Sequence, residues 1–298
     1  MEVVQFEGWS CARIVSGDTE ALVTLDVGPR VIRYGFIGGP NFMHVAPETK
    51  GQKGGDEYRS YGGHRLWIAP EDWKKTYVPE NHPVEAREEK GEYVFFSKPD
   101  QWCIQKEIRI ATRPQLGGLA LTHRIHNRSA YEVELAPWCL TVMGVGGVCL
   151  FPQAPFVPHS EDFLPARPLV LWGYTNMQDL RWTWGRRVVR LRQDSLPPQK
   201  VGAQVSQGYA GYANHGSLFL KRFPFEKGAD YPDFGCNFET FTREDMLEVE
   251  SVGPMTRVAS GGYAELREAW YLVPDFKVPN DEDELGDALE SLAAARPL

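Results

Sequence analysis

The sequence has few cysteines and no pattern that would pair them. Its 298 residues contain five, Cys11, Cys103, Cys139, Cys149 and Cys236, and no two form a Cys-x-x-Cys motif. An odd number of scattered thiols predicts neither a disulfide framework nor a zinc knuckle. We expect reduced cysteines in the core, and no metal or other cofactor.

An excess of basic residues is also absent. Lys and Arg number 32 against 40 for Asp and Glu, which gives a formal net charge of -8. Binding to a phosphate backbone or to anionic lipid needs a positive surface, so nucleic acid and membrane surfaces are not expected as partners.

The sequence also lacks long apolar segments. Residues 1–13 have no basic patch followed by an apolar run, so they are unlike a secretory signal. The uncharged stretch 135–160 contains four prolines, which leave no interval of about 20 residues for a membrane helix. We therefore expect a cytoplasmic protein, with buried strand and loop in this stretch.

Helical periodicity is absent before the C-terminus. Apolar residues instead alternate with polar ones in short runs bounded by Gly, Pro, Asn and Asp, which is typical of antiparallel strands. The expected strands are residues 21–27, 31–37, 93–97, 103–112, 119–127, 131–135, 188–193, 217–223, 237–242, 246–251 and 263–273.

These strands predict the fold class. No βαβ alternation, fixed repeat or linker divides the chain, so residues 1–298 are expected to form a single all-β domain, a β-sandwich of about 12 or more strands. One surface helix is expected near the C-terminus, over residues 281–295, with Asn280 as its N-cap and the tail ending at residue 298.

The densest cluster of polar and aromatic residues lies at 61–73. Gly62 and Gly63 allow the backbone to approach a ligand closely, and an imidazole, a guanidinium, carboxylates and indoles follow. Charged groups suit sugar hydroxyls, and an indole suits the apolar face of a pyranose ring. The alternative is a turn whose side chains only pack on a neighbouring strand. The candidate ligand-binding residues are His64, Arg65, Trp67 and Glu71.

A second cluster lies on two consecutive expected strands. Residues two apart in a strand share a face, so Asn237 and Glu239 point together, as do Glu248 and Glu250. Carboxylates that converge on one sheet face and are partly desolvated can act as general bases. The alternative is a solvated outer face.

Two further residues are weaker candidates. Lys200 can contact ligand hydroxyls from a short strand, although exposed lysines are common at sheet edges. His82, in a loop after the first cluster, can reach the same cleft or be exposed to solvent. His44, His159 and His215 have no ligand-like neighbours in the sequence, and His123 and His126 face opposite sides of a strand. The serine hydrolase, zincin and P-loop motifs are absent.

The order of these segments resembles the galactose mutarotase-like (aldose 1-epimerase) superfamily over nearly the whole chain, particularly a bacterial branch with a Gly-Gly-His-Arg-Leu-Trp segment. The matching segments are residues 25–30, 61–71, 121–129 with its Asn-x-Ser end, 247–250, and Gly261-Gly262 followed by a closing strand through Trp270.

The resemblance implies a large antiparallel β-supersandwich whose concave face binds a sugar or sugar derivative. In the family a glutamate removes the proton from the anomeric hydroxyl while a histidine protonates the ring oxygen. By position Glu248 is the base, with Glu250 as the alternative. The family's histidine is missing from residues 136–143, and His64, or less favourably His82, is the substitute.

Three functions therefore remain open. The first is an aldose 1-epimerase-like isomerase that uses Glu248 and His64. The second is a carbohydrate-binding protein without catalysis, in which Arg65, Trp67, Asn237 and Glu239 hold the sugar. The third is an accessory role on a polysaccharide, which would need an open groove lined by Trp172, Trp182 or Trp184. The oligomeric state cannot be inferred from the sequence.

Overall fold

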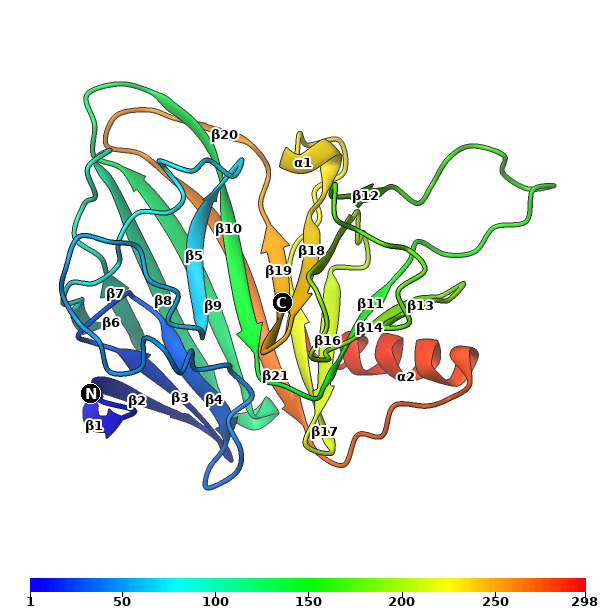
Figure 1. Ribbon diagram of the computed structural model, residues 1–298, viewed down its shortest axis with the longest axis horizontal. Coiled ribbons are helices and arrows are strands. Elements are labelled where there is room, and N and C mark those ends of the chain that lie inside the picture. Colours follow the sequence, from blue (N-terminus) through cyan, green and yellow to red (C-terminus); the bar gives the residue numbers. More distant parts are fainter.

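The computed structural model describes residues 1–298 as two large antiparallel sheets that pack face to face (Figure 1). The first sheet runs in the order β1 (Glu2–Phe6), β2 (Trp9–Ser16), β3 (Thr19–Thr24), β4 (Val31–Phe36), β5 (His64–Ala69), β10 (Val133–Met143), β19 (Met246–Val252), β18 (Phe238–Arg243), β15 (Gln199–Ala203) and β12 (Leu169–Leu171), with β20 (Thr256–Val258) paired to β10. The second runs β13 (Trp182–Trp184), β14 (Val188–Arg192), β11 (Val148–Pro152), β16 (Tyr209–Asn214), β17 (Ser217–Arg222), β21 (Tyr263–Val273), β9 (Gly118–Asn127), β8 (Ile104–Arg113), β7 (Glu92–Phe96) and β6 (Glu85–Glu89). The predicted all-β sandwich is confirmed.

The alternation of residues along each strand decides what enters the core between the sheets. In β19, Leu247 and Val249 join the largest hydrophobic cluster, which contains 31 buried residues from both sheets. The residues between them, Glu248 and Glu250, must then point to the outer face of the first sheet. The predicted common face of these two glutamates is therefore present, and it is the face turned away from the second sheet.

The C-terminal helix α2 (Glu282–Ala294) covers the outer face of the second sheet. Its Leu285, Leu289 and Ala293 pack against a second apolar cluster that includes Leu220 and Tyr271. The N-cap is Asp281, whose carboxylate accepts hydrogen bonds from the backbone N–H groups of residues 283 and 284. The prediction of Asn280 as N-cap was wrong by one residue, which is the usual uncertainty of a helix boundary.

Two short helical turns complete the secondary structure, a 3₁₀ turn η1 (Pro114–Leu116) and α1 (Pro232–Gly235). None of the helices combines the length and the apolar character needed to cross a membrane.

Every strand expected from alternation is present; β21 has the expected ends, and the ends of the others are shifted. The expected strand 131–135 is the start of β10, which continues to Met143 through a run that is buried on both faces. Several strands were not expected, β5 among them, and β15 was expected only as a short strand around Lys200. All residues of β5 and β15 are buried, so neither shows the alternation of polar and apolar residues that identifies a strand with one solvated face.

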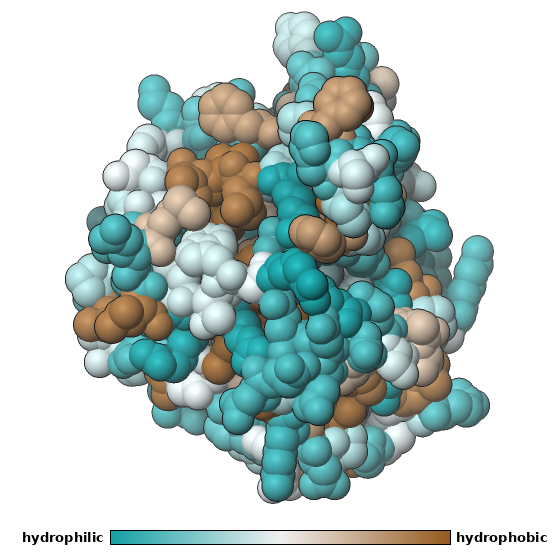
Figure 2. All heavy atoms as spheres, turned by 90° about the vertical axis from the view of Figure 1, so that its right-hand side faces the viewer, coloured by the Kyte–Doolittle hydropathy of each residue, from teal (hydrophilic) through white to brown (hydrophobic).

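A long loop, residues 153–168, projects from the sheets between β11 and β12 (Figure 1). It carries exposed apolar side chains at Phe156, Phe163 and Leu164. On the face shown in Figure 2, hydrophobic side chains lie in separate patches among hydrophilic ones.

Candidate functional site

A pocket of about 550 Å³ opens on the outer face of the first sheet. We call it the aromatic pocket, because half of its lining residues are aromatic. They are Tyr58, Ser60, Arg65, Trp67, Glu71, Trp73, Tyr77, Trp138, Leu140, Trp172, Tyr174, Lys200, Phe241, Arg243, Met246 and Glu248. Its volume lies in the range of small-molecule sites.

The floor of the aromatic pocket is set by the register of five adjacent strands. Arg65 of β5 lies opposite Leu140 of β10, and Glu248 of β19 lies opposite Phe241 of β18. Phe241 in turn lies opposite Lys200 of β15. Directly opposed residues in an antiparallel pair share a face, so residues distant in sequence converge here.

Arg65 and Glu248 form a buried ion pair in this floor. An Nη2 hydrogen of Arg65 is donated to Oε1 of Glu248 over 3.3 Å, and Arg65 and Glu248 are 4% and 6% exposed. The guanidinium carbon lies 4.2 Å from the centre of the Trp67 ring. Nε and Nη1 of Arg65 and Nε1 of Trp67 have no partner in the protein. These N–H groups are covered in the structure, and buried donors left without partners are costly, so a ligand oxygen that reaches them would remove that cost.

Lys200 forms the opposite wall with two carboxylates behind it. Its Nζ lies 2.7 Å from Oε2 of Glu239 and 3.4 Å from Oε2 of Glu250, and it lies 4.7 Å from the ring centres of both Trp138 and Trp172. Burial alone would lower the pKa of Lys200, but the two glutamates raise it above its ordinary value. Lys200 is therefore a fixed cation.

The two glutamates behind Lys200 are fully buried. Burial raises the pKa of Glu239 to about 8 and that of Glu250 to about 7, although Lys200 opposes the change. The indole N–H of Trp138 is donated to Glu250 over 2.8 Å. Neither glutamate lines the aromatic pocket, so they act on a ligand only through Lys200 and Trp138.

Aromatic rings surround these charges. The rings of Trp67 and Trp138 meet edge to face with their centres 5.5 Å apart, and the ring centres of Tyr77 and Trp67 are 5.0 Å apart. Flat apolar rings beside unpartnered donors suit a pyranose, which has apolar faces and a polar rim. The arrangement can thus bind a sugar by stacking and hydrogen bonds together.

Of the other predicted ligand-binding residues, Glu71 lines the pocket and Asn237 does not. Glu71 is exposed and accepts a hydrogen bond from the Tyr77 hydroxyl. Asn237 precedes β18 and is occupied by the backbone of Val205, whose N–H and C=O it binds at 2.7 and 3.1 Å. It therefore holds a loop, although the shared face with Glu239 had predicted a ligand contact.

The structure also separates His64 from the aromatic pocket. It is the residue before Arg65 in β5, so its side chain points to the opposite face, between the two sheets, and is fully buried. The expectation that His64 reaches a sugar beside Glu248 disagrees with this geometry. The sequence did not reveal the orientation, because both faces of β5 are buried.

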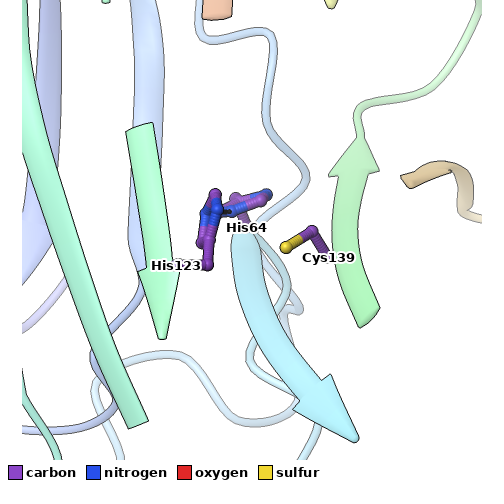
Figure 3. A group of neighbouring side chains, drawn as sticks. All are labelled: His64, His123 and Cys139. Atoms are coloured by element: carbon purple, nitrogen blue, oxygen red, sulfur yellow. Dashed lines mark hydrogen bonds between the residues drawn. The ribbon is translucent and has the colours of Figure 1, made fainter. Parts of the chain in front are cut away.

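His64 belongs instead to a polar cluster inside the sandwich, shown in Figure 3 with His123 and Cys139. Its Nε2 lies 2.8 Å from Nε2 of His123, and its Nδ1 lies 2.9 Å from the Thr141 hydroxyl. Burial lowers the pKa of both histidines, well below the ordinary value for His64.

The hydrogen bonds assign the tautomers of these neutral rings. His123 Nδ1 lies 3.1 Å from the Leu266 carbonyl, which can only accept, so His123 carries its proton there. His64 must then donate from Nε2 to His123 and accept at Nδ1 from Thr141. The ring nitrogens and the Cys139 sulfur lie within 4.8 Å of one another and are suitable metal ligands, but a metal ion would have to displace the bond between the rings.

Lys221 completes this interior cluster. Its Nζ lies 2.8 Å from Glu268 and 3.0 Å from the Thr141 hydroxyl, and both charged residues are fully buried. The cluster joins β5, β9, β10, β17 and β21, so it connects the two sheets.

His82 lies in a different cavity, of about 360 Å³. This cavity is also lined by Glu80 and Lys106, which form a buried ion pair with each other. His82 itself is exposed, and the structure does not bring it together with Glu248.

Several lining residues were not predicted as part of this site. Strand register brings Trp138 and Phe241 into the pocket, and connections between strands bring in Tyr58 and Tyr174, so no local sequence pattern marks the four as one site. Trp172, expected only in a polysaccharide groove, lines the pocket, whereas Trp182 and Trp184 stack on each other away from it.

Comparisons with known proteins identify the fold. No protein-family model and no curated protein matches the chain. Among solved structures, a galactose mutarotase-like protein from Lactobacillus casei is similar with a TM-score of 0.59 and 11% identity, covering 88% of this chain and 99% of its own. A putative aldose 1-epimerase from Klebsiella pneumoniae gives 0.60 and 12%, covering 98% of this chain and 85% of its own. A putative mutarotase from Salmonella typhimurium gives 0.59 and 9%, covering 91% and 93%. The chain has the galactose mutarotase-like fold.

Proposed function

We propose that the aromatic pocket binds a sugar or sugar derivative and that the protein interconverts its anomers, with Glu248 as the general base. The observation that carries this proposal is the position of the Glu248 carboxylate, in the floor of a pocket that offers both aromatic rings and unpartnered N–H donors. The similarity to putative aldose 1-epimerases and a galactose mutarotase-like protein supports the reaction class.

The reaction needs a base at one oxygen and an acid at another. Glu248 removes the proton from the hydroxyl on the anomeric carbon, C1, and a carbonyl forms there. The bond from C1 to the ring oxygen breaks, its electron pair moves to that oxygen, and an acid protonates it. Reclosure on the other face of the carbonyl reverses these transfers, so both groups return to their original protonation states.

The pocket residues have distinct tasks in this scheme. Arg65 orients the Glu248 carboxylate through the 3.3 Å bond, and its free Nε and Nη1 bind sugar oxygens. Trp67 and Trp138 hold the apolar face of the ring, and Lys200 binds a hydroxyl or an anionic substituent from the opposite wall.

Proton NMR saturation transfer on glucose, galactose and glucose 6-phosphate tests the proposal. We expect the protein to accelerate anomer exchange for at least one of them, and Glu248→Gln to reduce that rate by a factor of about 10²–10⁴ while sugar binding persists. Unchanged exchange in Glu248→Gln would refute the base assignment.

Sugar binding without catalysis is the second candidate, and one observation favours it: no histidine lines the aromatic pocket. It predicts that the three sugars quench the fluorescence of the pocket tryptophans but that their anomers do not exchange faster. Exchange by the wild-type protein would eliminate this candidate.

A further inference from the structure

A proton donor for the ring oxygen is missing among the residues that line the aromatic pocket. Lys200 and Arg65 hold their protons too tightly, because the pKa of each is raised by neighbouring anions although burial opposes this. Burial raises the pKa of Tyr174 to about 12. Glu239 and Glu250 are sealed behind Lys200 and Trp138. None of these groups is a ready proton donor, and no histidine lines the pocket, so a histidine nearby on this face of the sheet is the stronger candidate.

His44 lies on this face, beside the strand that carries Leu140. Met43 forms a β-bridge with Met143, and both methionines are buried in the core between the sheets. Because side chains alternate, His44 points the other way, to the outer face. Its backbone N–H is donated to the Val142 carbonyl over 2.9 Å.

Val142 places His44 relative to Glu248. The Val142 carbonyl and N–H bond to His44 and Gly63 on one side, and Val142 lies opposite Glu248 on the other side. His44 and Glu248 thus flank Val142 on one face of the sheet, with only a short aliphatic side chain between them. C1 of the sugar carries two oxygens, the anomeric hydroxyl and the ring oxygen. The reaction needs a base at the first and an acid at the second, so both groups must lie on the same face of the sheet.

Asp245 lies beside the imidazole of His44. Its Oδ2 lies 3.5 Å from His44 Nε2, and its Oδ1 accepts a hydrogen bond from Arg243 over 3.0 Å. Arg243 and Met246, on either side of this turn, both line the aromatic pocket. His44 is 9% exposed. Its Nε2 is covered and has no hydrogen bond, whereas its Nδ1 stays accessible. A carboxylate behind one imidazole nitrogen, with the other free, is the arrangement that orients a histidine for proton transfer.

We propose that His44 is the proton donor for a sugar bound in the aromatic pocket and that Asp245 is its positioning residue. His44 lies just outside the lining, beside Asp245 in the turn between the lining residues Arg243 and Met246. This inference rests on the proposed function. The Nδ1–H of the protonated ring gives its proton to the ring oxygen as the C1–O bond breaks, while Glu248 takes the proton of the anomeric hydroxyl. On reclosure His44 recovers its proton from that oxygen and Glu248 returns its own.

The charges around His44 set the pH dependence. Burial is the largest influence on the pKa of His44 and lowers it. The carboxylates of Asp245, Glu48 and Glu248 raise this pKa, and the guanidinium of Arg243 lowers it. Because the acid must be protonated, the exchange rate should fall as the pH rises through a value below the ordinary 6.5 of histidine.

The test compares His44→Asn with His159→Asn, the same change on the exposed loop. We expect His44→Asn to lower anomer exchange by a factor of about 10²–10⁴, to leave KM within about threefold and to abolish this fall of rate with pH. His159→Asn should match the wild type. Imidazole should restore part of the rate of His44→Ala. In the wild type, the sugar should move the ¹⁵N resonances of His44 and not those of His159.

The outcomes separate the two proposals. If the wild type exchanges anomers and Glu248→Gln does not, but His44→Asn keeps its rate, the donor assignment is wrong and the proposed function stands. If no sugar exchanges faster with the wild type, both are wrong. If His44→Asn does not fold, the ¹⁵N chemical shifts of His44 in the wild type still decide. Shifts that stay unchanged at saturating sugar would overturn the inference, and shifts that change would support it.

Discussion

Replacement of Lys200 by methionine should destabilise the protein, and more so as the pH rises. The ammonium is the only cation within ion-pair distance of Glu239 and Glu250, which are both fully buried. Removal of one partner from a buried ion pair costs about 3–5 kcal/mol, because the remaining carboxylate must either stay charged in the interior or take up a proton. We expect a loss of that size at pH 8 in urea unfolding, with Lys227→Met as the exposed control.

The sign of the pH effect follows from the raised pKa values. Glu239 and Glu250 titrate at about 8 and 7 in the folded protein, above the ordinary 4.5, so the folded state binds more protons than the unfolded state. Their contribution is fully present below pH 4.5 and is lost as the pH rises through the folded values.

Without Lys200 the folded protein keeps about one more proton. The difference in unfolding free energy between Lys200→Met and the wild type should therefore grow by up to about 1.4 kcal/mol per pH unit between pH 6 and 8. Equal losses at the two pH values would refute the linkage, and a loss below about 1 kcal/mol would refute the role of Lys200 as partner of both carboxylates. Addition of Glu239→Gln should recover part of the stability, because only one carboxylate then remains unpaired.

Two further substitutions separate the two faces of β5. His64→Phe removes a hydrogen-bond partner of His123 and of Thr141, so the free energy of unfolding should fall by about 1–3 kcal/mol for each buried group left unpaired. Anomer exchange per folded molecule should stay the same. Slower exchange without a loss of stability would show that His64 takes part in the reaction. Trp67→Phe removes an unpartnered N–H together with part of a buried ring, so urea unfolding should show some loss of stability. Sugar affinity per folded molecule, measured by fluorescence titration, should fall about 2- to 12-fold, the worth of one hydrogen bond. Unchanged affinity would exclude Nε1 of Trp67 as a ligand donor.

The sequence predicts this fold well, because its long strands show one buried and one less buried face. Strand β8 is an example, with Ile104, Ile108 and Ile110 buried and Gln105 and Arg109 partly exposed. The common face of Glu248 and Glu250 follows from the same period of two. Which of them lines the pocket does not follow, because Glu250 is covered by Trp138 and Lys200, which come from other strands.

Pairings between distant segments are where sequence reasoning stops. His44 has no ligand-like neighbour in the sequence, and its Asp245 partner lies about 200 residues away in a hairpin turn. Lys200 looks like an ordinary strand lysine until its register with Phe241, and that of Glu239 with Glu250, places it over two carboxylates. Cross-strand register is a global property of the fold, so no local pattern reveals these contacts.

The Gly-Gly-His-Arg-Leu-Trp segment contributes both to the core and to the aromatic pocket, because β5 has a different set of side chains on each face. His64 and Leu66 point inward, to the polar cluster with His123 and to the apolar cluster with Ile125. Arg65 and Trp67 point outward, to Glu248 and to the pocket aromatics. A shift of one residue in this strand would exchange the two sets, placing a guanidinium between the sheets and an imidazole beside Glu248. The neutral, fully hydrogen-bonded histidine pair therefore does more than fill the core: by fixing the register of β5 it fixes which side chains the aromatic pocket receives.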